Sequence, residues 1–208
     1  MATILRDWSY RYPWLYQGIA KTTALMVGGD ARLRQLPLVG IPINRDDHGL
    51  DLCCGRGEAT RYLVQHCQHV IGLDASPKAL QVAQQQVPQA QYVEGWAQAM
   101  PFSEASFDWV HISLALHELQ PQIRTQVLNE VHRVLKPQGI LAVIDFHRPQ
   151  TPLMWPGLAV FLWLFETETA WQMIEQDLAD QVMQAGFELS KQTFHAGGSL
   201  QVIQARRF

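Results

Sequence analysis

The amino-acid sequence predicts an α/β fold: a mostly parallel, seven-stranded sheet with helices on both faces and an antiparallel hairpin at its C-terminal end. Short apolar runs alternate with segments of helical spacing over residues 48–146, as in a parallel sheet whose strands are joined by helices. Two further apolar runs, 187–194 and 199–205, flank Ala196-Gly197-Gly198, which is the pattern of a hairpin. Five strands in the first region and two in the second make up the predicted sheet.

The individual elements follow from these runs in chain order. We expect strands near residues 49–54, 69–74, 91–94, 107–113 and 139–146. We expect helices near residues 57–66, 77–86 and 121–135. Ahead of the first strand, one helix would run from Pro13 to about Val27 and a shorter one from Asp30 to Leu36. The chain therefore divides into an N-terminal helical and aromatic extension, 1–47, and a domain, 48–208, with an apolar insertion at about 152–175.

Composition argues against several classes of protein. The formal net charge is -3, and the basic cluster Arg206-Arg207 is too small to bind a nucleic-acid backbone. The three cysteines suggest no disulfide framework, and the eight histidines show no metal-ligand spacing, so we expect no metal site. The N-terminus does not have the pattern of a signal peptide. These features predict a cytoplasmic protein. Its cysteines would be small buried side chains that stay reduced in that compartment.

The segment Leu50-Asp51-Leu52-Cys53-Cys54-Gly55-Arg56-Gly57 carries the strongest functional signal. An apolar run ends there in a turn where Gly55 and Gly57 let the backbone approach a ligand closely. A second apolar run, Val70-Ile71-Gly72-Leu73-Asp74, ends in an acid that can accept hydrogen bonds from two ribose hydroxyls. A dinucleotide site would need a third glycine, and none follows at that spacing. Asp51 would repel a pyrophosphate but can reach a cationic amino group, so the pattern favours S-adenosylmethionine.

Four motifs in the right order resemble the class I S-adenosylmethionine-dependent methyltransferases, and together they cover about residues 48–146. The first is the glycine turn, and the others are residues 93–102, 106–110 and 133–141. The resemblance implies a Rossmann-like fold, S-adenosylmethionine as cofactor and S-adenosylhomocysteine as product. The double cysteine of the first motif is similar to that of quinone-ring methyltransferases of the ubiquinone and menaquinone type.

The cofactor site is predicted at the strand ends. Asp51 would orient the methionine end, and Ala75 would border the adenine. Asp74 would hold the ribose, or else cap the helix that begins near Ser76. The predicted cofactor-binding residues are Asp51, Cys53, Gly55, Gly57, Asp74, Ala75, Trp96, Ala97 and Ser113.

Two of these positions depart from the family pattern. Cys53 stands where the family usually has a glycine, although a small side chain can often be accommodated there. Trp96 stands where many relatives carry an aspartate that accepts a hydrogen bond from the adenine amino group. We expect Trp96 to stack on the adenine or to lie over the pocket as a lid, with Ala97 supplying a backbone N–H.

A phenol or hydroquinone acceptor would need a general base, and histidine suits this role near neutral pH. His117, after the fourth strand, and His147, after the fifth, are the candidates for a base or substrate ligand. His111 lies inside a predicted strand, so we expect a structural role for it. Glu118 would orient His117 only poorly, because neighbours on a helix do not face each other. Residues 113–119 do not match the arginine-containing segment usual in the quinone-ring enzymes.

Aromatic and apolar segments predict a lipophilic substrate pocket. An aromatic cluster in the N-terminal extension suits either a lid over the cofactor and substrate, where aromatic faces stabilise a sulfonium, or ordinary packing. Its members are Tyr10, Tyr12, Trp14 and Tyr16. Residues 152–165, which include Trp155, are almost entirely apolar but too short to span a membrane. They would form a buried core helix, the wall of a substrate pocket, or a weak contact with a membrane surface, which the nearby glutamates disfavour.

We therefore predict a methyltransferase that acts on a small lipophilic molecule, expected to be aromatic and phenol- or quinol-like. The alternatives are a protein or RNA methyltransferase, for which the sequence offers no basic patch, and a non-catalytic module that keeps the fold. A nicotinamide-dependent oxidoreductase is less well supported, because the third glycine is absent. The sequence predicts no oligomeric state.

Overall fold

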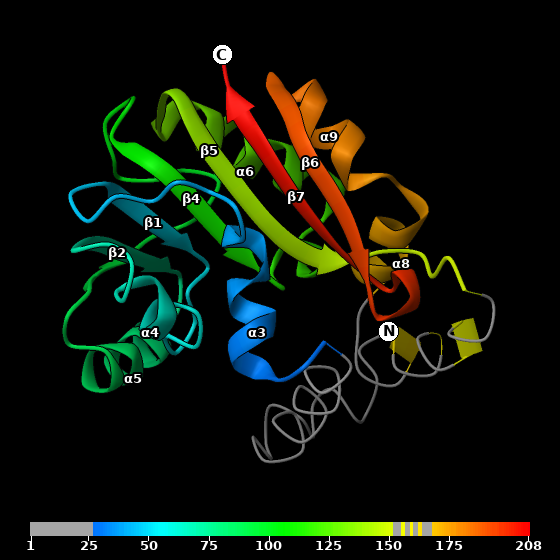
Figure 1. Ribbon diagram of the computed structural model, residues 1–208, viewed down its shortest axis with the longest axis horizontal. Coiled ribbons are helices and arrows are strands. Elements are labelled where there is room, and N and C mark those ends of the chain that lie inside the picture. Colours follow the sequence, from blue (N-terminus) through cyan, green and yellow to red (C-terminus); the bar gives the residue numbers. More distant parts are fainter. Residues whose placement is uncertain (1–26, 152–154, 157–158, 160–161, 164–167) are drawn as a thin grey trace.

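A computed structural model of the chain describes residues 27–151, 155–156, 159, 162–163 and 168–208 (Figure 1). In this part of the chain seven strands form one sheet in the order β3-β2-β1-β4-β5-β7-β6. Neighbours among β1 to β5 are parallel, whereas β7 lies antiparallel between β5 and β6. The predicted sheet and hairpin are confirmed. The strands are β1 His48–Leu52, β2 His69–Asp74, β3 Gln91–Glu94, β4 Phe107–Ser113, β5 Leu135–Phe146, β6 Phe187–His195 and β7 Leu200–Arg207.

Helices connect these strands. The α-helices are α3 Asp30–Gln35, α4 Thr60–Leu63, α5 Pro77–Gln86, α6 Pro121–Val134, α8 Glu168–Glu175 and α9 Leu178–Gln184. Short 3₁₀ helices are η1 Leu36–Leu38, η2 Leu116–Glu118 and η4 Ala196–Gly198. The helix predicted from Pro13 to about Val27 falls outside the described residues except for Val27 itself.

Three boundaries differ from the prediction for physical reasons. β1 ends at Leu52 rather than near residue 54, because Cys53 adopts a left-handed conformation, φ 58°, that a strand cannot hold. The helix expected over 57–66 is reduced to α4, with turns on both sides of it. β5 begins before residue 139, since Leu135 already pairs with Phe107 of β4.

Two of the connecting helices begin at a proline. Pro77 of α5 and Pro121 of α6 lie in the first turn, where the missing N–H costs no helical hydrogen bond. The Ser76 hydroxyl caps α5 by accepting the Ala79 N–H at 3.3 Å. In α6 the buried positions recur at helical spacing, so one face of this helix packs against the sheet. These positions are Arg124, Val127, Leu128, Val131 and Val134.

Alternate residues of the central strands face opposite layers of helices. Leu141 and Val143 of β5 pack with buried residues of α6 and α9. Between them, Ala142 faces the other way and packs with Leu38 of η1 and Leu63 of α4. Figure 1 shows this arrangement, with α3 in front of the sheet and α6 and α9 behind it.

The indole of Trp109 on β4 is buried against the backbone of Gly49 on β1. These two residues are register partners in the parallel pairing of the strands. A Cβ added at Gly49 would lie 2.0 Å from Cζ2 of Trp109, far inside van der Waals contact. Packing therefore requires glycine at position 49.

We expect Gly49→Ala to lower the free energy of unfolding by about 1–3 kcal/mol, the usual cost of overpacking a core. Urea denaturation measures this change. Trp109→Phe provides the matched background, because its smaller ring leaves room for the added methyl group. Gly49→Ala should cost less in that background than in the wild-type chain. Equal costs in the two backgrounds would show that the clash with Trp109 is not the cause.

Candidate active site

The carboxyl ends of β1 and β4 lie side by side where the strand order reverses. Open α/β sheets bind their ligands at such a switch point, outside the carboxyl ends of the strands. Asp51 of β1 and His111 of β4 are register partners across this boundary. We call this end of the sheet the carboxyl edge. It also receives Asp74 from β2, Ser113 from β4 and Asp145 from β5.

The predicted glycine turn follows β1 directly. Gly55 and Gly57 have φ values of 56° and 82°, in the region that glycine adopts most easily. A Cβ added at Gly57 would only touch Ala83 and the Tyr92 hydroxyl, each 3.4 Å away, so the backbone conformation and not the space favours glycine there. Cys53 is a third residue of this turn with a left-handed backbone. It adopts this conformation although it has a side chain, at the position where glycine was expected from the motif. Such strain is typical of functional turns.

The Asp74 carboxylate holds both the glycine turn and the start of α5. Its Oδ2 accepts the Gly55 N–H at 2.8 Å, and its Oδ1 accepts the Ser76 N–H at 2.9 Å. The two roles predicted for this acid are therefore compatible, because a carboxylate offers about four acceptor positions and two are used here. The neighbouring Ala75 is exposed, as a residue bordering a ligand would be.

Asp51 is buried and already engaged on both oxygens. The Thr60 hydroxyl of α4 donates to its Oδ2 at 2.6 Å, and Nδ1 of His111 lies 3.0 Å from its Oδ1. Nε2 of His111 faces a second acceptor, the carbonyl oxygen of Arg34 in α3, at 3.1 Å. Both ring nitrogens thus meet acceptors, which an imidazolium satisfies. The structural role predicted for His111 is thus a pairing with Asp51, a partner 60 residues away that local sequence does not reveal.

The pKa of the half-buried Cys53 thiol is affected by the negative charge at the carboxyl edge. Burial raises its pKa to about 12, and four carboxylates add to the effect. In order of influence they are Asp74, Glu118, Asp51 and Asp145. The thiol is therefore uncharged at neutral pH. Acids from four separate elements gather around it, which favours a ligand with net positive charge.

The segment between β3 and β4 forms a second border of the edge. Trp96 is 65% exposed, whereas Ala97 is buried. The carbonyl oxygen of Trp96 accepts the Ala99 N–H at 3.0 Å, which closes a turn. The predicted stacking of Trp96 on adenine, or its role as a lid, would use this exposed ring.

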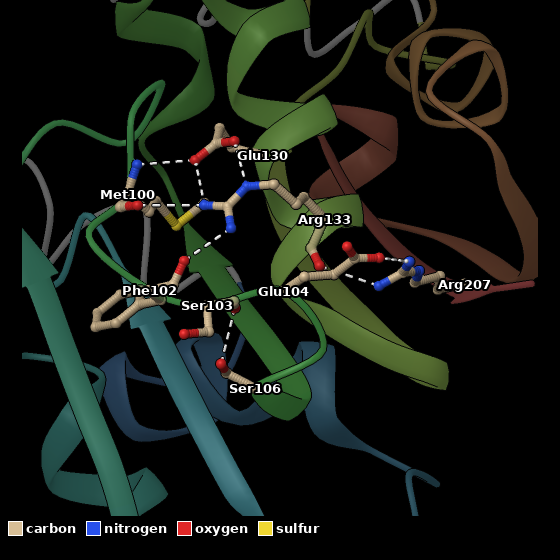
Figure 2. Close-up of polar contacts among 8 residues, drawn as sticks. All are labelled: Met100, Phe102, Ser103, Glu104, Ser106, Glu130, Arg133 and Arg207. Carbon is tan, nitrogen blue, oxygen red and sulfur yellow. Dashed lines mark hydrogen bonds and ion pairs between the residues drawn. The ribbon is translucent and has the colours of Figure 1, made fainter.

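A charged pair on α6 fixes this segment (Figure 2). Arg133 donates to the carbonyl oxygens of Phe102, at 2.7 Å, and Met100, at 3.2 Å. Glu130 accepts the Met100 N–H at 2.9 Å and pairs with Nε of Arg133 at 2.7 Å. The second and fourth sequence motifs are thereby joined in space, with Arg133 of the fourth holding the backbone of the second.

His117, a predicted base, is paired with Asp145. Its Nδ1 lies 2.6 Å from Asp145 Oδ1, and both residues are buried. Asp145 also accepts the backbone N–H groups of Leu116 at 2.8 Å, His117 at 3.3 Å and Phe146 at 2.8 Å. Asp145, and not the neighbouring Glu118, is therefore the acid that orients His117. The position of Asp145 near the end of a predicted strand, where ligands bind, is the sequence feature that could have identified this acid.

His147, the other predicted base, is attached to the C-terminal hairpin. Its Nδ1 lies 2.9 Å from the carbonyl oxygen of Gly198, and its ring lies 4.6 Å from that of Phe194. The two candidate bases therefore differ in surroundings, since His117 pairs with a carboxylate and His147 with a backbone carbonyl.

Of the remaining predicted site residues, Ser113 and Trp155 lie in the described part of the chain and the four aromatic residues of the extension do not. Ser113 accepts a hydrogen bond from Nη1 of Arg34 at 3.0 Å. Trp155 is 38% exposed, with its ring 6.3 Å from that of Trp171 and 5.9 Å from the Arg148 guanidinium carbon. The aromatic cluster of the extension, Tyr10, Tyr12, Trp14 and Tyr16, lies outside the described residues.

Within the described ranges, no helix is long and apolar enough to cross a membrane. In the same residues, no group of three or more His, Cys, Asp or Glu side chains is placed to hold a metal ion.

Comparisons with known proteins identify the family of the chain. A family model described as a methyltransferase domain matches residues 50–139. The chain is 55% identical over 206 residues to an uncharacterized methyltransferase of Synechocystis sp., covering 99% of this chain and 97% of that protein. It is 34% identical over 173 residues to the demethylmenaquinone methyltransferase of Lactiplantibacillus plantarum, covering 74% of this chain and 71% of the relative.

A solved structure shows the same fold. The TehB-like S-adenosylmethionine-dependent methyltransferase of Corynebacterium glutamicum has a TM-score of 0.68 at 19% identity, covering 97% of this chain and 99% of that one. The sheet and the glycine turn thus define a class of nucleoside-binding enzyme. The chain belongs to the class I S-adenosylmethionine-dependent methyltransferases, and it is an enzyme with that cofactor.

The residues at the carboxyl edge fit this cofactor. The left-handed turn at Cys53, Gly55 and Gly57 allows close backbone approach. Asp74 retains acceptor positions for ribose hydroxyls, and the surrounding carboxylates suit a ligand that bears a sulfonium and an ammonium group.

We expect Asp74→Ala to weaken S-adenosylmethionine binding at least tenfold, or about 1.4 kcal/mol, through loss of the ribose acceptor and of the support to Gly55. Calorimetric titration measures the dissociation constant. Glu94→Ala is the matched control, because Glu94 is the register partner of Asp74 at the end of the neighbouring strand. Unchanged affinity in Asp74→Ala would remove this acid from the cofactor site.

Proposed function

We propose that the enzyme methylates a small, lipophilic aromatic acceptor of the phenol or quinol type. The observation that carries the proposal is the buried contact of 2.6 Å between His117 and Asp145 at the carboxyl edge. A histidine held by a carboxylate is suited to remove a proton from a hydroxyl group. The 34% identical relative, whose name is demethylmenaquinone methyltransferase, supports a quinol-like acceptor.

The pairing determines which nitrogen of His117 can act. Asp145 accepts the N–H groups of Leu116 and Phe146, so it is an acceptor and Nδ1 of His117 must donate to it. The lone pair of the neutral ring then lies on Nε2, which is the atom suited to take the acceptor's proton. The carboxylate stabilises the positive charge that the ring gains. The cofactor supplies an electrophilic methyl group, and a deprotonated acceptor attacks it more readily.

An apolar cluster adjoins this pair through Phe146. The His117 ring lies 4.5 Å from that of Phe146, which belongs to an apolar cluster at the carboxyl end of β5. The buried members of this cluster are Val27, Leu33, Ile144, Phe146, Leu162, Ala170, Ile174, Leu200 and Val202. Leu162, from the segment 152–165, is fully buried in this cluster, which fits the predicted role of that segment as a buried core helix beside the site. Apolar surroundings exclude water and strengthen the charged pair.

We also propose that the N-terminal extension covers the site. α3 belongs to the predicted extension, and Arg34 joins it to the end of β4 through contacts with His111 and Ser113. The preceding aromatic cluster stays a prediction as the lid. A cytoplasmic location is likewise part of the proposal, supported by three free cysteines that suit a reducing compartment.

An acceptor screen tests the proposed substrate class. Purified enzyme would be given methyl-labelled S-adenosylmethionine with hydroquinones and phenols of increasing lipophilicity. Analogues whose hydroxyl groups are already methylated are the matched controls. Label should enter the hydroxylated aromatics and not the blocked analogues. Transfer to protein or RNA alone would overturn the proposal.

We expect His117→Ala to lower kcat by about 10²–10⁴-fold, the usual contribution of general base catalysis, with little change in cofactor affinity. Asp145→Asn should also lower kcat, because an amide cannot stabilise the imidazolium. Steady-state kinetics with an accepted phenol or hydroquinone, beside calorimetry with the cofactor, separates the two effects. His147→Ala is the control and should retain most of its turnover. Normal turnover in His117→Ala would disprove the assignment of the base.

A further inference from the structure

We propose that Arg34 binds the carboxylate of the cofactor's methionine end. The inference concerns the cofactor, which family membership establishes. It does not depend on the proposed acceptor or on the assignment of His117.

Two contacts hold Arg34 at the carboxyl edge, although it is distant in sequence from the strand that it meets. Its Nη1 donates to the Ser113 hydroxyl at 3.0 Å across 79 residues. Its carbonyl oxygen faces Nε2 of His111 at 3.1 Å across 77 residues. Since His111 in turn contacts Asp51, the Arg34 backbone is fixed relative to the end of β1 as well. The guanidinium therefore lies at the end of β4, the strand that pairs with β1 and its Asp51, the acid expected to orient the methionine end.

The carboxylate of the cofactor's methionine end would be stabilised by a positively charged side chain at the carboxyl edge. The methionine end carries an ammonium group, which carboxylates attract, and a carboxylate, which they repel. Asp51, Asp74 and Asp145 all lie near the ends of strands at this edge, so a positive partner would favour binding of the ligand carboxylate there. Arg124 is fully buried on α6 and donates to the side chains of Gln176 and Gln181. His111 has both ring nitrogens engaged. Arg34 is a partly exposed cation at this edge, and its Nη2 makes no hydrogen bond to the described residues.

The guanidinium of Arg34 retains capacity for a second anion. Its Nε faces Asp30 at 3.4 Å, a long ion pair with a carboxylate that is 44% exposed. Its Nη1 carries the bond to Ser113, and its Nη2 makes no hydrogen bond within the described part of the chain. The side chain is 16% exposed, so a ligand can reach it. A guanidinium with free N–H groups binds a carboxylate with two parallel hydrogen bonds, and the Ser113 contact fixes its orientation.

The test compares two ligands that differ only in the group in question. S-adenosylmethionine and decarboxylated S-adenosylmethionine would be titrated calorimetrically into the wild-type enzyme, Arg34→Ala, Arg34→Lys and Arg32→Ala. Arg34→Ala should weaken binding of S-adenosylmethionine by about ten- to hundredfold, as expected for charge-assisted hydrogen bonds. Its affinity for the decarboxylated ligand should stay unchanged. Arg34→Lys should lose less, because it keeps the charge without the paired donors.

Arg32→Ala is the matched control, because Arg32 is an exposed arginine on the same helix. It should bind both ligands as the wild type does. Equal weakening of both ligands in Arg34→Ala would show that Arg34 acts through the fold and would overturn the proposal. Unchanged affinity for both would also overturn it. If Arg34→Ala does not fold, Arg34→Lys carries the same comparison, with a selective loss for S-adenosylmethionine as the expected result.

Discussion

The contact between Asp51 and His111 is the interaction on which the site depends. A buried carboxylate is costly unless it is paired and hydrogen-bonded, and here its two oxygens meet His111 and Thr60. The pair joins β1 to β4 at the point where the strand order reverses. Through Thr60 it holds α4, and through the Arg34 carbonyl oxygen it holds α3. Loss of one partner would leave an uncompensated buried charge, which typically costs about 3–5 kcal/mol.

The charge of the carboxyl edge has a consequence for turnover. S-adenosylmethionine has a net positive charge, whereas S-adenosylhomocysteine has none, because methyl transfer removes the sulfonium. The carboxylates around Cys53 therefore attract the cofactor more strongly than the product. The backbone bonds of Asp74 keep one of these acids in place whether or not a ligand is bound. The arrangement favours exchange of product for fresh cofactor.

Local patterns predicted most of the fold and the cofactor turn. Gly55, Gly57 and Asp74 could be identified because each follows directly from a strand end and a spacing that only a few turns satisfy. The pairs Asp51–His111 and His117–Asp145 could not, since 60 and 28 residues separate their members in sequence. Strand order decides which of the acids and histidines meet. Hydrophobic periodicity does not contain that information.

The need for glycine at position 49 could not be predicted from local sequence either, because it arises from packing between two strands. Nothing in its own neighbourhood indicates that the Trp109 ring covers it, because the strands that carry them meet only in the sheet. Cys53 is the reverse case. Its place in the turn was evident from sequence, but the strain that it holds became visible only in its φ of 58°. Local sequence thus locates a site, and long-range contacts determine which groups in it can act.

Asp145 connects this site to the protein core. Arg124, on α6, is fully buried, and burial lowers its pKa, while the negative charge of Asp145 offsets part of that effect. The hydrogen bonds of Arg124 go from Nε and Nη2 to the neutral side chains of Gln181 and Gln176, so they do not balance the charge, and Nη1 has no partner among the described residues. Asp145 therefore orients His117 and also reduces the cost of burying Arg124. An amide at position 145 could replace the shape of the carboxylate and accept one hydrogen bond, but it carries no charge to stabilise the imidazolium or to offset the burial of Arg124. This double demand gives a physical reason for an acid at the end of β5.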